Sequence, residues 1–205
     1  MSLEKVTVLG GGVLGTQIGL MCAYYGKDVT FWLRSESSVT RTQPKIDRYS
    51  SLILADLEAA KGLIGNPMGA FVYPRGLIRN WKEATAESID AQLAEAGKNF
   101  AEKVHIVIDK AEAVKDADIV IESMSEDPKA KIDVYTAFKD LLPEKTILCT
   151  NSSTLLPSTF AEYTGRPTAP GRNPGIRTAY EKRKVCFQTF LFSYARRDSN
   201  PRPTA

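Results

Sequence analysis

Cysteine, histidine and long apolar runs are all scarce in this chain of 205 residues. Its three cysteines, Cys22, Cys149 and Cys186, are odd in number and lack the spacing of metal ligands. We therefore interpret them as reduced thiols, which are typical of a cytoplasmic protein, and expect neither a disulfide scaffold nor a metal site. No apolar run approaches the ~18 residues that a membrane helix needs, and no signal-peptide pattern precedes the first strand. The sequence thus predicts no contact with a membrane.

The only histidine, His105, lies inside the apolar run of residues 104–108, which predicts a strand. A histidine in the interior of a strand is away from the loops where binding and catalytic residues gather. We therefore interpret His105 as a structural or surface residue. Because a general acid or base at neutral pH is most often a histidine, the sequence offers no obvious residue for that role.

The positive charge of the chain is concentrated in its last part. With 43% hydrophobic and 25% charged residues, the overall composition is that of a globular protein. Residues 165–205 hold nine Lys and Arg against Glu181 and Asp198, whereas residues 1–164 carry a net charge of −4. A basic tail is able to bind nucleic acid, but this one lacks amphipathic periodicity and any nucleic-acid-binding motif. We therefore expect no nucleic-acid partner.

A glycine-rich stretch follows the first apolar run. Residues 6–9 predict a buried strand, and the next residues carry glycines with G-x-G-x-x-G spacing before apolar residues at helical spacing. In such a unit the first glycine permits a tight turn, the second lets a pyrophosphate approach the backbone, and the third lets the helix pack on the strand. The N–H groups at the helix N-terminus then hold the negative charge. The residues expected to contact a dinucleotide are Gly10, Gly12, Val13, Leu14 and Gly15; a glycine-rich turn without a ligand is the alternative.

The second strand, residues 28–33, ends without the Asp or Glu that normally bonds to a ribose 2′-hydroxyl. Arg34 follows it, with Ser35 and further hydroxyls beside it, and this combination suits a 2′-phosphate through charge-assisted hydrogen bonds. We therefore favour NADP over NAD as the cofactor. Two alternatives are a solvated Arg34 on a loop and a Glu36 that turns toward the ribose.

Two stripes of apolar residues at helical spacing then interrupt the pattern of strands. The first stripe consists of Ile46, Tyr49, Ile53, Leu57 and Ala60, and the second of Ile89, Leu93, Ala96 and Phe100. A connection with Pro67, Gly69, Pro74 and Gly76 separates them. We expect an inserted helical pair at about residues 44–102, joined by a long loop of the kind that is usually functional.

Strands and helices alternate again after the insertion. Residues 104–108, 119–121 and 146–150 predict strands, and residues 111–117 and 128–142 predict helices. The second of these helices begins with Asp127 as its N-cap and Pro128 in its first turn. The alternation predicts an α/β fold, a doubly wound (Rossmann) and mostly parallel sheet with helices on both faces, followed by an irregular C-terminal tail.

Polar residues follow two of these strands, at the edge where parallel sheets bind ligands. Glu126 and Lys131 come after the strand at residues 119–121, where a helix N-terminus favours carboxylates with or without a ligand. Asn151 and Ser153 come after the last predicted strand. That cluster either caps the following turn or presents an amide and hydroxyls to a nicotinamide and a substrate oxygen. The sequence leaves both alternatives open.

Together these segments resemble the N-terminal NAD(P)-binding domain of the 3-hydroxyacyl-CoA dehydrogenases over about residues 4–168. The resemblance depends on Val-Leu-Gly-Gly-Gly-Val-Leu-Gly at 8–15, the helical insertion, Ala-Asp-Ile-Val-Ile-Glu-Ser at 117–123 and Thr-Ile-Leu-Cys-Thr-Asn-Ser-Ser-Thr-Leu at 146–155. It implies that Glu126, Lys131 and Asn151 contact the cofactor and that Ser153 helps to hold the substrate's oxygen. It also implies reversible hydride transfer between the nicotinamide and the 3-hydroxyl of an acyl-CoA, whose CoA part touches the inserted helices.

Three departures from the family pattern lead us to expect impaired catalysis. Leu33 stands where the family has its ribose-binding acid. No His-Phe-x-Asn-Pro motif, with its catalytic histidine, follows Arg166-Pro167, and the glutamate that orients that histidine is missing. The family's helical dimerisation domain is missing too, so we expect a monomer or a weak oligomer. For residues 169–205 we expect a poorly ordered basic tail, or translation in a foreign frame after a frameshift near residue 168.

The function that the resemblance implies is a 3-hydroxyacyl-CoA dehydrogenase of fatty acid metabolism, with residues 1–168 as its dinucleotide-binding domain. Two other functions stay open: a non-catalytic NAD(P)-binding or sensor module, and a Rossmann reductase of small hydroxy or keto acids. Cofactor binding without turnover would indicate the module, and turnover of a free keto acid would indicate the reductase.

Overall fold

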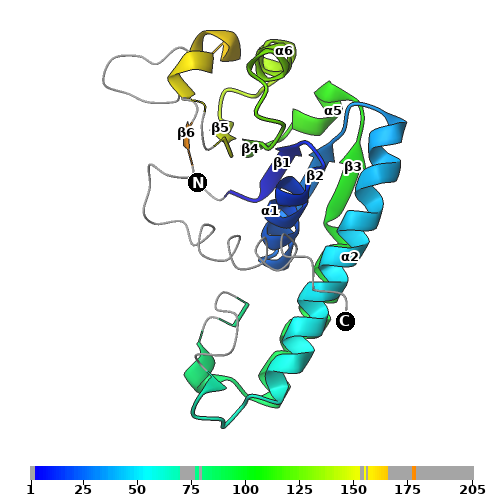
Figure 1. Ribbon diagram of the computed structural model, residues 1–205, viewed down its shortest axis with the longest axis vertical. Coiled ribbons are helices and arrows are strands. Elements are labelled where there is room, and N and C mark those ends of the chain that lie inside the picture. Colours follow the sequence, from blue (N-terminus) through cyan, green and yellow to red (C-terminus); the bar gives the residue numbers. More distant parts are fainter. Residues whose placement is uncertain are drawn as a thin grey trace, which may run out of the picture.

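The computed structural model describes residues 3–69, 77–78, 80–152, 155, 157–165 and 177–178. Within this part of the chain six strands form one sheet in the order β3-β2-β1-β4-β5-β6, and each neighbouring pair is parallel (Figure 1). The chain moves outward from β1 to β3 and then returns to β4, so the topology switches between β1 and β4. The predicted doubly wound α/β fold is confirmed.

The strands are short and the helices differ widely in length. The strands are β1 (Lys5–Leu9), β2 (Asp28–Trp32), β3 (Val104–Val107), β4 (Ile119–Glu122), β5 (Ile147–Thr150) and β6 (Arg177–Thr178). The helices are α1 (Val13–Tyr24), α2 (Glu36–Lys61), α4 (Ala86–Glu102), α5 (Lys110–Val114) and α6 (Pro128–Phe138), with 3₁₀ turns η1 (Trp81–Glu83) and η2 (Pro157–Thr164). Both helices after β3 end earlier than predicted, whereas Asp127 caps α6 as expected by accepting hydrogen bonds from the N–H groups of Lys129 and Ala130.

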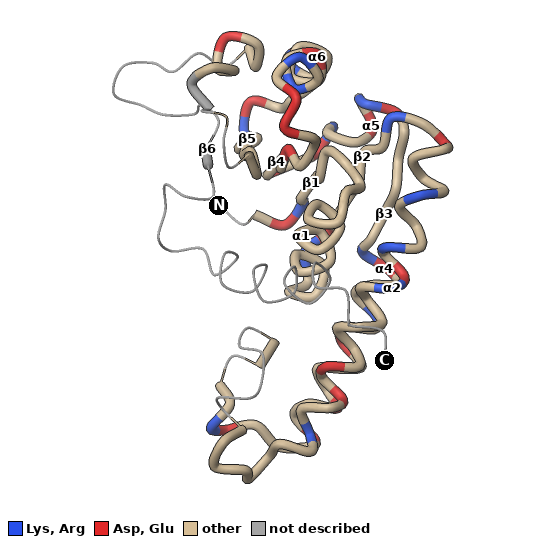
Figure 2. The backbone as a smooth tube through the Cα atoms, viewed as in Figure 1, with Lys and Arg blue, Asp and Glu red and all other residues tan. Residues whose placement is uncertain are grey.

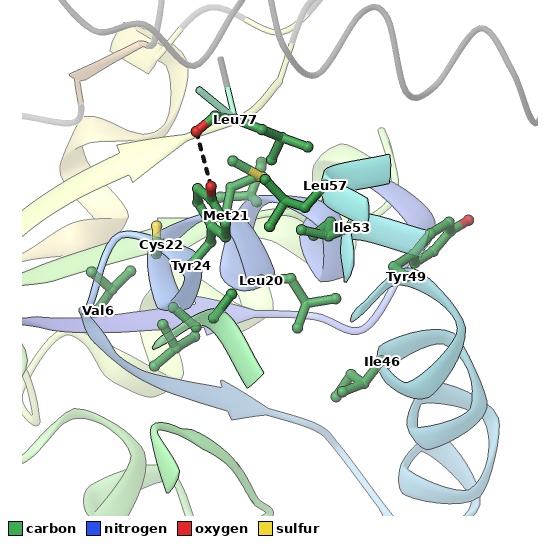
Figure 3. Packing of buried hydrophobic residues seen from close by; sticks show 14 of the residues in the cluster. Val6, Leu20, Met21, Cys22, Tyr24, Ile46, Tyr49, Ile53, Leu57 and Leu77 are labelled. Carbon is green, nitrogen blue, oxygen red and sulfur yellow. Dashed lines mark hydrogen bonds between the residues drawn. The ribbon is translucent and has the colours of Figure 1, made fainter. Parts of the chain in front are cut away.

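Two apolar layers lie on opposite faces of the sheet, because successive side chains of each strand alternate between them. One layer joins Val6 and Val8 of β1 to α1, α2 and α4, and the other joins Leu9 to α5, α6 and η2. In the first layer the Tyr24 hydroxyl points toward Leu77 and donates a hydrogen bond of 2.9 Å to the Leu77 carbonyl (Figure 3). The sheet is therefore covered by helices on both faces.

Helix α1 carries no charged residue and packs directly on the sheet (Figure 2). It is buried from Gly15 to Tyr24. A Cβ atom at Gly19 would overlap the ring of Phe31 in β2, so only glycine permits this approach. The close packing fixes the N-terminus of α1 above the carboxyl end of β1.

The two inserted helices are α2 and α4, and every residue of the first predicted stripe is buried. In the second stripe Ile89 and Ala96 are buried, whereas Leu93 and Phe100 are partly buried against the same layer. Figure 1 shows α2 continuing well beyond the sheet. Helix α2 begins at Glu36, before the boundary expected at residue 44, and continues through Pro44. Of the connection between the helices, residues 70–76 and 79 lie outside the described part.

The predicted tail contributes one short element to the described structure. Arg177 and Thr178 pair in parallel with Cys149 and Thr150, which makes β6 the outermost strand. The other residues of 169–205 lie outside the described part, as does Cys186. Among the helices that the structure describes, none has the length and apolar character to cross a membrane.

Asp118 joins three segments at the amino end of the sheet. One carboxylate oxygen accepts hydrogen bonds of 2.9 Å from the N–H groups of Glu4 and Lys5, and the other accepts one of 2.6 Å from Lys145 Nζ. The hydrogen bond from Lys145, followed by that from the Lys5 backbone, lowers the pKa of Asp118 from 3.8 to about 2. The ionised carboxylate therefore stabilises the start of β1 next to β4.

We predict that Asp118→Asn removes part of the acid sensitivity of folding. Because the folded pKa is lowered, the stabilisation by Asp118 is present above pH 3.8 and is lost as the pH falls toward about 2. Urea unfolding midpoints measured across this range should fall less steeply for the variant than for the wild type. Asp140→Asn, at an exposed position, is the control that should follow the wild-type curve. Parallel curves for Asp118→Asn and the wild type would contradict the assignment.

Candidate dinucleotide site

The carboxyl ends of three neighbouring strands form the base of the candidate site. We call these strand ends, with the residues that directly follow them, the crest. Leu9, Glu122 and Thr150 are register partners across β1, β4 and β5. The residues that follow them, Gly10, Ser123 and Asn151, are therefore brought side by side, and backbone hydrogen bonds of 3.0 Å (Ser123 N–H to Leu9) and 2.8 Å (Asn151 N–H to Glu122) continue the ladder. The crest includes the switch between β1 and β4, where open α/β sheets bind ligands.

The glycines of the turn have different surroundings. Gly10 has a φ of +116°, and a Cβ there would lie 2.7 Å from the carbonyl oxygen of Ser123. A Cβ at Gly15 would lie 3.0 Å from both the Gly10 carbonyl oxygen and Ser123 Oγ. At Gly12, by contrast, a Cβ would meet no atom of the chain within 4 Å. Gly10 and Gly15 are thus required by packing, whereas the space above Gly12 is open.

That open space lies at the N-terminus of α1. Gly12 is the N-cap and provides no side-chain acceptor to the first turn, although its carbonyl accepts hydrogen bonds of 2.9 Å from the N–H and hydroxyl of Thr16. The first turn contains no acidic residue, and Val13 is 46% exposed. The first N–H groups of a helix have no acceptor within the helix, so they favour an anion at this point.

Gly11, for which the sequence suggested no role, is the residue at which α2 contacts the turn. A Cβ at Gly11 would overlap the side chain of Thr42 and lie 2.8 Å from Leu33. The Gly11 carbonyl accepts hydrogen bonds from Lys45 Nζ at 2.9 Å and from Thr42 Oγ1 at 3.3 Å. The sequence does contain a sign of this contact. Of the three consecutive glycines, only Gly10 and Gly12 fit the dinucleotide spacing, so Gly11 needs another reason.

Arg34 and Ser35 lie at the junction of β2 and α2. Ser35 is the N-cap of α2, so Ser37 and Ser38, two of the hydroxyls expected beside Arg34, belong to the first turn of a helix. The Ser35 Oγ lies 3.0 Å from Ser37 Oγ and 3.2 Å from Ser38 Oγ. Arg34 is exposed and lines a cavity of about 820 Å³, together with Trp32 and residues of α5 and α6. The acid expected by the family pattern is replaced by Leu33, which is buried.

Glu122 and Lys131 form an ion pair inside the protein. Their side chains are 0% and 1% exposed, and Lys131 Nζ donates to both carboxylate oxygens, at 2.7 and 2.8 Å. The structure thus gives Lys131 an internal partner, and its predicted contact with a cofactor stays a prediction. The partnership of Glu122 with Lys131 was not predicted from the sequence; a Glu at the end of an apolar strand was the only sign of it.

The remaining predicted residues lie beside the crest. Asn151 Nδ2 donates a long hydrogen bond of 3.4 Å to Ser123 Oγ, so the amide lies over β4. Glu126 is exposed and accepts a hydrogen bond of 2.6 Å from Ser152 Oγ, which connects the segments after β4 and β5. Ser153, the predicted catalytic residue, lies outside the described residues, so the structure does not place it.

His105 is not part of the crest. It lies in β3, opposite Thr30 of β2, and its Nε2 is 3.0 Å from Asp28 Oδ1 at the start of β2. Both residues line a different cavity at the amino ends of the strands. The described residues also contain no group of three or more His, Cys, Asp or Glu that would hold a metal ion. The crest therefore offers backbone N–H groups, hydroxyls, an amide and a carboxylate, but no imidazole from the described residues.

A family model and a characterised relative both match this chain. Residues 75–170 match the family described as 3-hydroxyacyl-CoA dehydrogenase, NAD binding domain. A 3-hydroxybutyryl-CoA dehydrogenase of Clostridioides difficile is 31% identical over 163 residues, which make up 80% of this chain and 46% of that protein.

Two solved structures extend the comparison. A diketoreductase, described as acting on dicarbonyl compounds, is 32% identical with a TM-score of 0.54, over 81% of this chain and 47% of that one. FadB2 of M. tuberculosis, at 18% identity, shares the fold with a TM-score of 0.57 over 87% of this chain and 49% of that one. The chain spans about half the length of each of these relatives. These matches identify its Rossmann fold as the N-terminal NAD-binding domain of the 3-hydroxyacyl-CoA dehydrogenase family.

Proposed function

We propose that this chain binds a nicotinamide dinucleotide at the crest, as the nucleotide-binding part of a 3-hydroxyacyl-CoA dehydrogenase. The observation that carries the proposal is the open space above Gly12, at a helix N-terminus without a side-chain cap and at the switch point of the sheet. When bound, the dinucleotide would supply hydride transfer. The nucleotide-binding unit is residues 1–168, and the match to the family ends near that boundary, at residue 170.

We assign the two halves of the cofactor to opposite sides of the turn. The pyrophosphate lies on the N–H groups of the first turn of α1, next to Gly12, Val13 and Leu14. The nicotinamide half extends toward Asn151 and Glu126, because both lie on the β4–β5 side of the turn. Ser153 remains our candidate for holding the substrate oxygen.

Gly12→Val tests the pyrophosphate position. The new side chain would enter the open space, so we predict that dinucleotide affinity falls on the order of tenfold or more, because losing about 1.4 kcal/mol is enough for that. Stability should fall by no more than about 1 kcal/mol, the usual effect of a poor N-cap residue, since the Cβ meets no atom of the chain and φ is −69°. Nucleotide fluorescence titration and urea unfolding measure the two quantities.

Gly97→Val is the matched control for this substitution. A Cβ at Gly97, in α4, also meets nothing within 4 Å, but this helix lies away from the crest. We expect nucleotide affinity equal to that of the wild type. Should Gly12→Val bind as tightly as Gly97→Val, the pyrophosphate is not at this turn.

We further propose that the cofactor is NADP rather than NAD. The buried Leu33 replaces the acid that would bond to a ribose 2′-hydroxyl and repel a phosphate. Arg34 stands beside it, exposed and facing a cavity, and the N-terminus of α2 adds a helix dipole and the hydroxyl of Ser35. These features support a phosphate at the 2′ position.

Arg34→Ala tests this preference. A hydrogen bond to a charged group is worth about 1.5–3 kcal/mol, so the variant should bind NADPH roughly 10- to 100-fold more weakly. NADH has no 2′-phosphate, and its affinity should stay the same. The control is Arg48→Ala, at an exposed arginine within α2, which should leave both affinities unchanged. Equal losses for NADH and NADPH would remove the case for NADP.

We propose an acyl-CoA substrate and a place in fatty acid metabolism on the basis of the family resemblance. The relative from C. difficile is named for 3-hydroxybutyryl-CoA, and the diketoreductase is described for dicarbonyl compounds. Because the only histidine of the chain is at the opposite end of the sheet, we propose that catalysis is impaired and that the chain binds cofactor better than it turns substrate over. A cytoplasmic location fits Cys22 and Cys149, which carry thiols rather than a disulfide; a monomer or weak oligomer stays a prediction.

Steady-state oxidation of NADH and NADPH tests the activity. With acetoacetyl-CoA we expect a rate about 10²–10⁴-fold below that of the C. difficile relative, because this is the usual effect of losing a general base. The control is free acetoacetate, with which we expect no turnover. Turnover of acetoacetate alone would indicate a keto-acid reductase, and cofactor binding without any turnover would indicate a binding or sensor module. A rate equal to that of the relative would contradict impaired catalysis.

A further inference from the structure

One buried carboxylate receives five hydrogen bonds directly below the crest. Glu122 accepts two from Lys131 Nζ, one of 2.6 Å from Thr150 Oγ1, one of 3.1 Å from the Tyr135 hydroxyl and one of 2.7 Å from the N–H of Met124. The donors come from β5, from α6 and from the loop after β4. This single group therefore connects all three elements that surround the nicotinamide side of the site.

Two of these hydrogen bonds lead directly to residues that we assign to the cofactor. The Met124 N–H fixes the loop that carries Glu126. Thr150 Oγ1, while donating to Glu122, accepts a hydrogen bond of 3.1 Å from the N–H of Ser152, and Ser152 Oγ then donates to Glu126. The segments after β4 and after β5 are thus joined through one carboxylate.

The surrounding donors hold this carboxylate in one orientation. Lys131 is the one cation among its described donors, and both side chains are almost completely buried. Burial, and next the negative charge of Glu122, raises the pKa of Tyr135 far above its ordinary value, so this residue stays a neutral donor. A buried ion pair seldom stabilises a fold more than an apolar replacement of similar volume does. Its value at this position must then be sought in the geometry that it imposes on the crest.

We propose that Glu122 is a positioning residue for the cofactor site, and that Lys131 acts on the cofactor as the counter-ion of Glu122 rather than by touching it. The proposal rests on the proposed function for its binding readout. It differs from the role that the family resemblance implies for Lys131, which is a direct contact. The two roles predict different behaviour when both partners of the ion pair are changed.

A double-mutant cycle of Glu122→Gln and Lys131→Met separates the two roles. If Lys131 acts through Glu122, Lys131→Met weakens NADPH binding about tenfold in the wild type and causes little further loss in the Glu122→Gln chain. Lys131→Arg, which keeps the counter-ion, should restore most of the affinity. A direct contact predicts instead the same loss from Lys131→Met in both backgrounds, which would overturn the proposal. Lys139→Met, at the exposed C-cap of α6, is the control with wild-type affinity.

Folding is monitored in the same series, because either single change leaves a buried charge without its partner. The double variant removes both charges, so it can be measured even if a single variant fails to fold. A folded double variant that binds NADPH like the wild type contradicts the proposal. Weakened binding, which a direct contact of Lys131 also predicts, supports it only together with faster amide exchange at Met124 and Ser152.

Amide hydrogen exchange gives a second readout, which needs no cofactor. In the ligand-free double variant we expect faster exchange at Met124 and Ser152 and unchanged exchange at Val8 in β1. Wild-type exchange rates at Met124 and Ser152 would overturn the positioning role. If the wild type binds neither NADH nor NADPH, the proposed function fails, and the exchange rates still decide whether Glu122 orders the crest.

Discussion

The contact between the glycine turn and the end of β4 is the constraint on which the rest of the site depends. At Gly10 the backbone passes so close to Ser123 that a Cβ would lie 2.7 Å from its carbonyl oxygen, and at Gly15 the helix returns to the same residue. Parallel register then places Asn151 next to Ser123. Since this approach fixes where α1 begins, it also fixes the direction in which its first N–H groups point. Packing therefore requires two glycines of the turn, Gly10 and Gly15, whether or not a ligand binds there.

Only a glycine that packing does not require can indicate a ligand. A glycine required by packing has atoms of the chain where a Cβ would lie, as Gly11 and Gly19 do, and no ligand is needed to explain it. Gly12 has an ordinary φ of −69° and open space above it, so neither strain nor packing requires glycine there. A bound group that approaches the backbone is a sufficient reason, and dinucleotide-binding turns place a pyrophosphate at this position.

Periodicity was enough to predict most of the fold from the sequence. The strands at β1, β4 and β5 are short apolar runs, and α4 has both an apolar stripe and a capping box at Thr85 and Ser88. The start of α2 could not be predicted in this way, because its first turns are polar and exposed on most sides, and Pro44 argued against a helix there.

The residues of the candidate site that come directly after strands could be predicted from the sequence. Gly10, Glu126 and Asn151 were placed near one another by that rule, since the carboxyl ends of parallel strands share one edge. The role of Glu122 and the burial of Lys131 were not predictable, because a lysine on a helix is normally exposed. Its ammonium is drawn inside only when β4, β5 and α6 have come together, and no local pattern contains that information.

The fold separates the chemistry that this chain retains from the chemistry that it lacks. Positive charge lies at the β2 side of the crest, on Arg34 and Lys45, while the acidic and amide groups of Glu126 and Asn151 lie on the β4–β5 side. A dinucleotide bound as we propose, with its pyrophosphate at the first turn of α1, therefore has one favourable direction, with its 2′-phosphate toward α2 and its nicotinamide toward β5. The only histidine, His105, belongs to the opposite end of the sheet and cannot reach the nicotinamide without unfolding β3. The described residues thus favour one orientation of the proposed cofactor, whereas any proton transfer has to come from a group other than an imidazole of this chain.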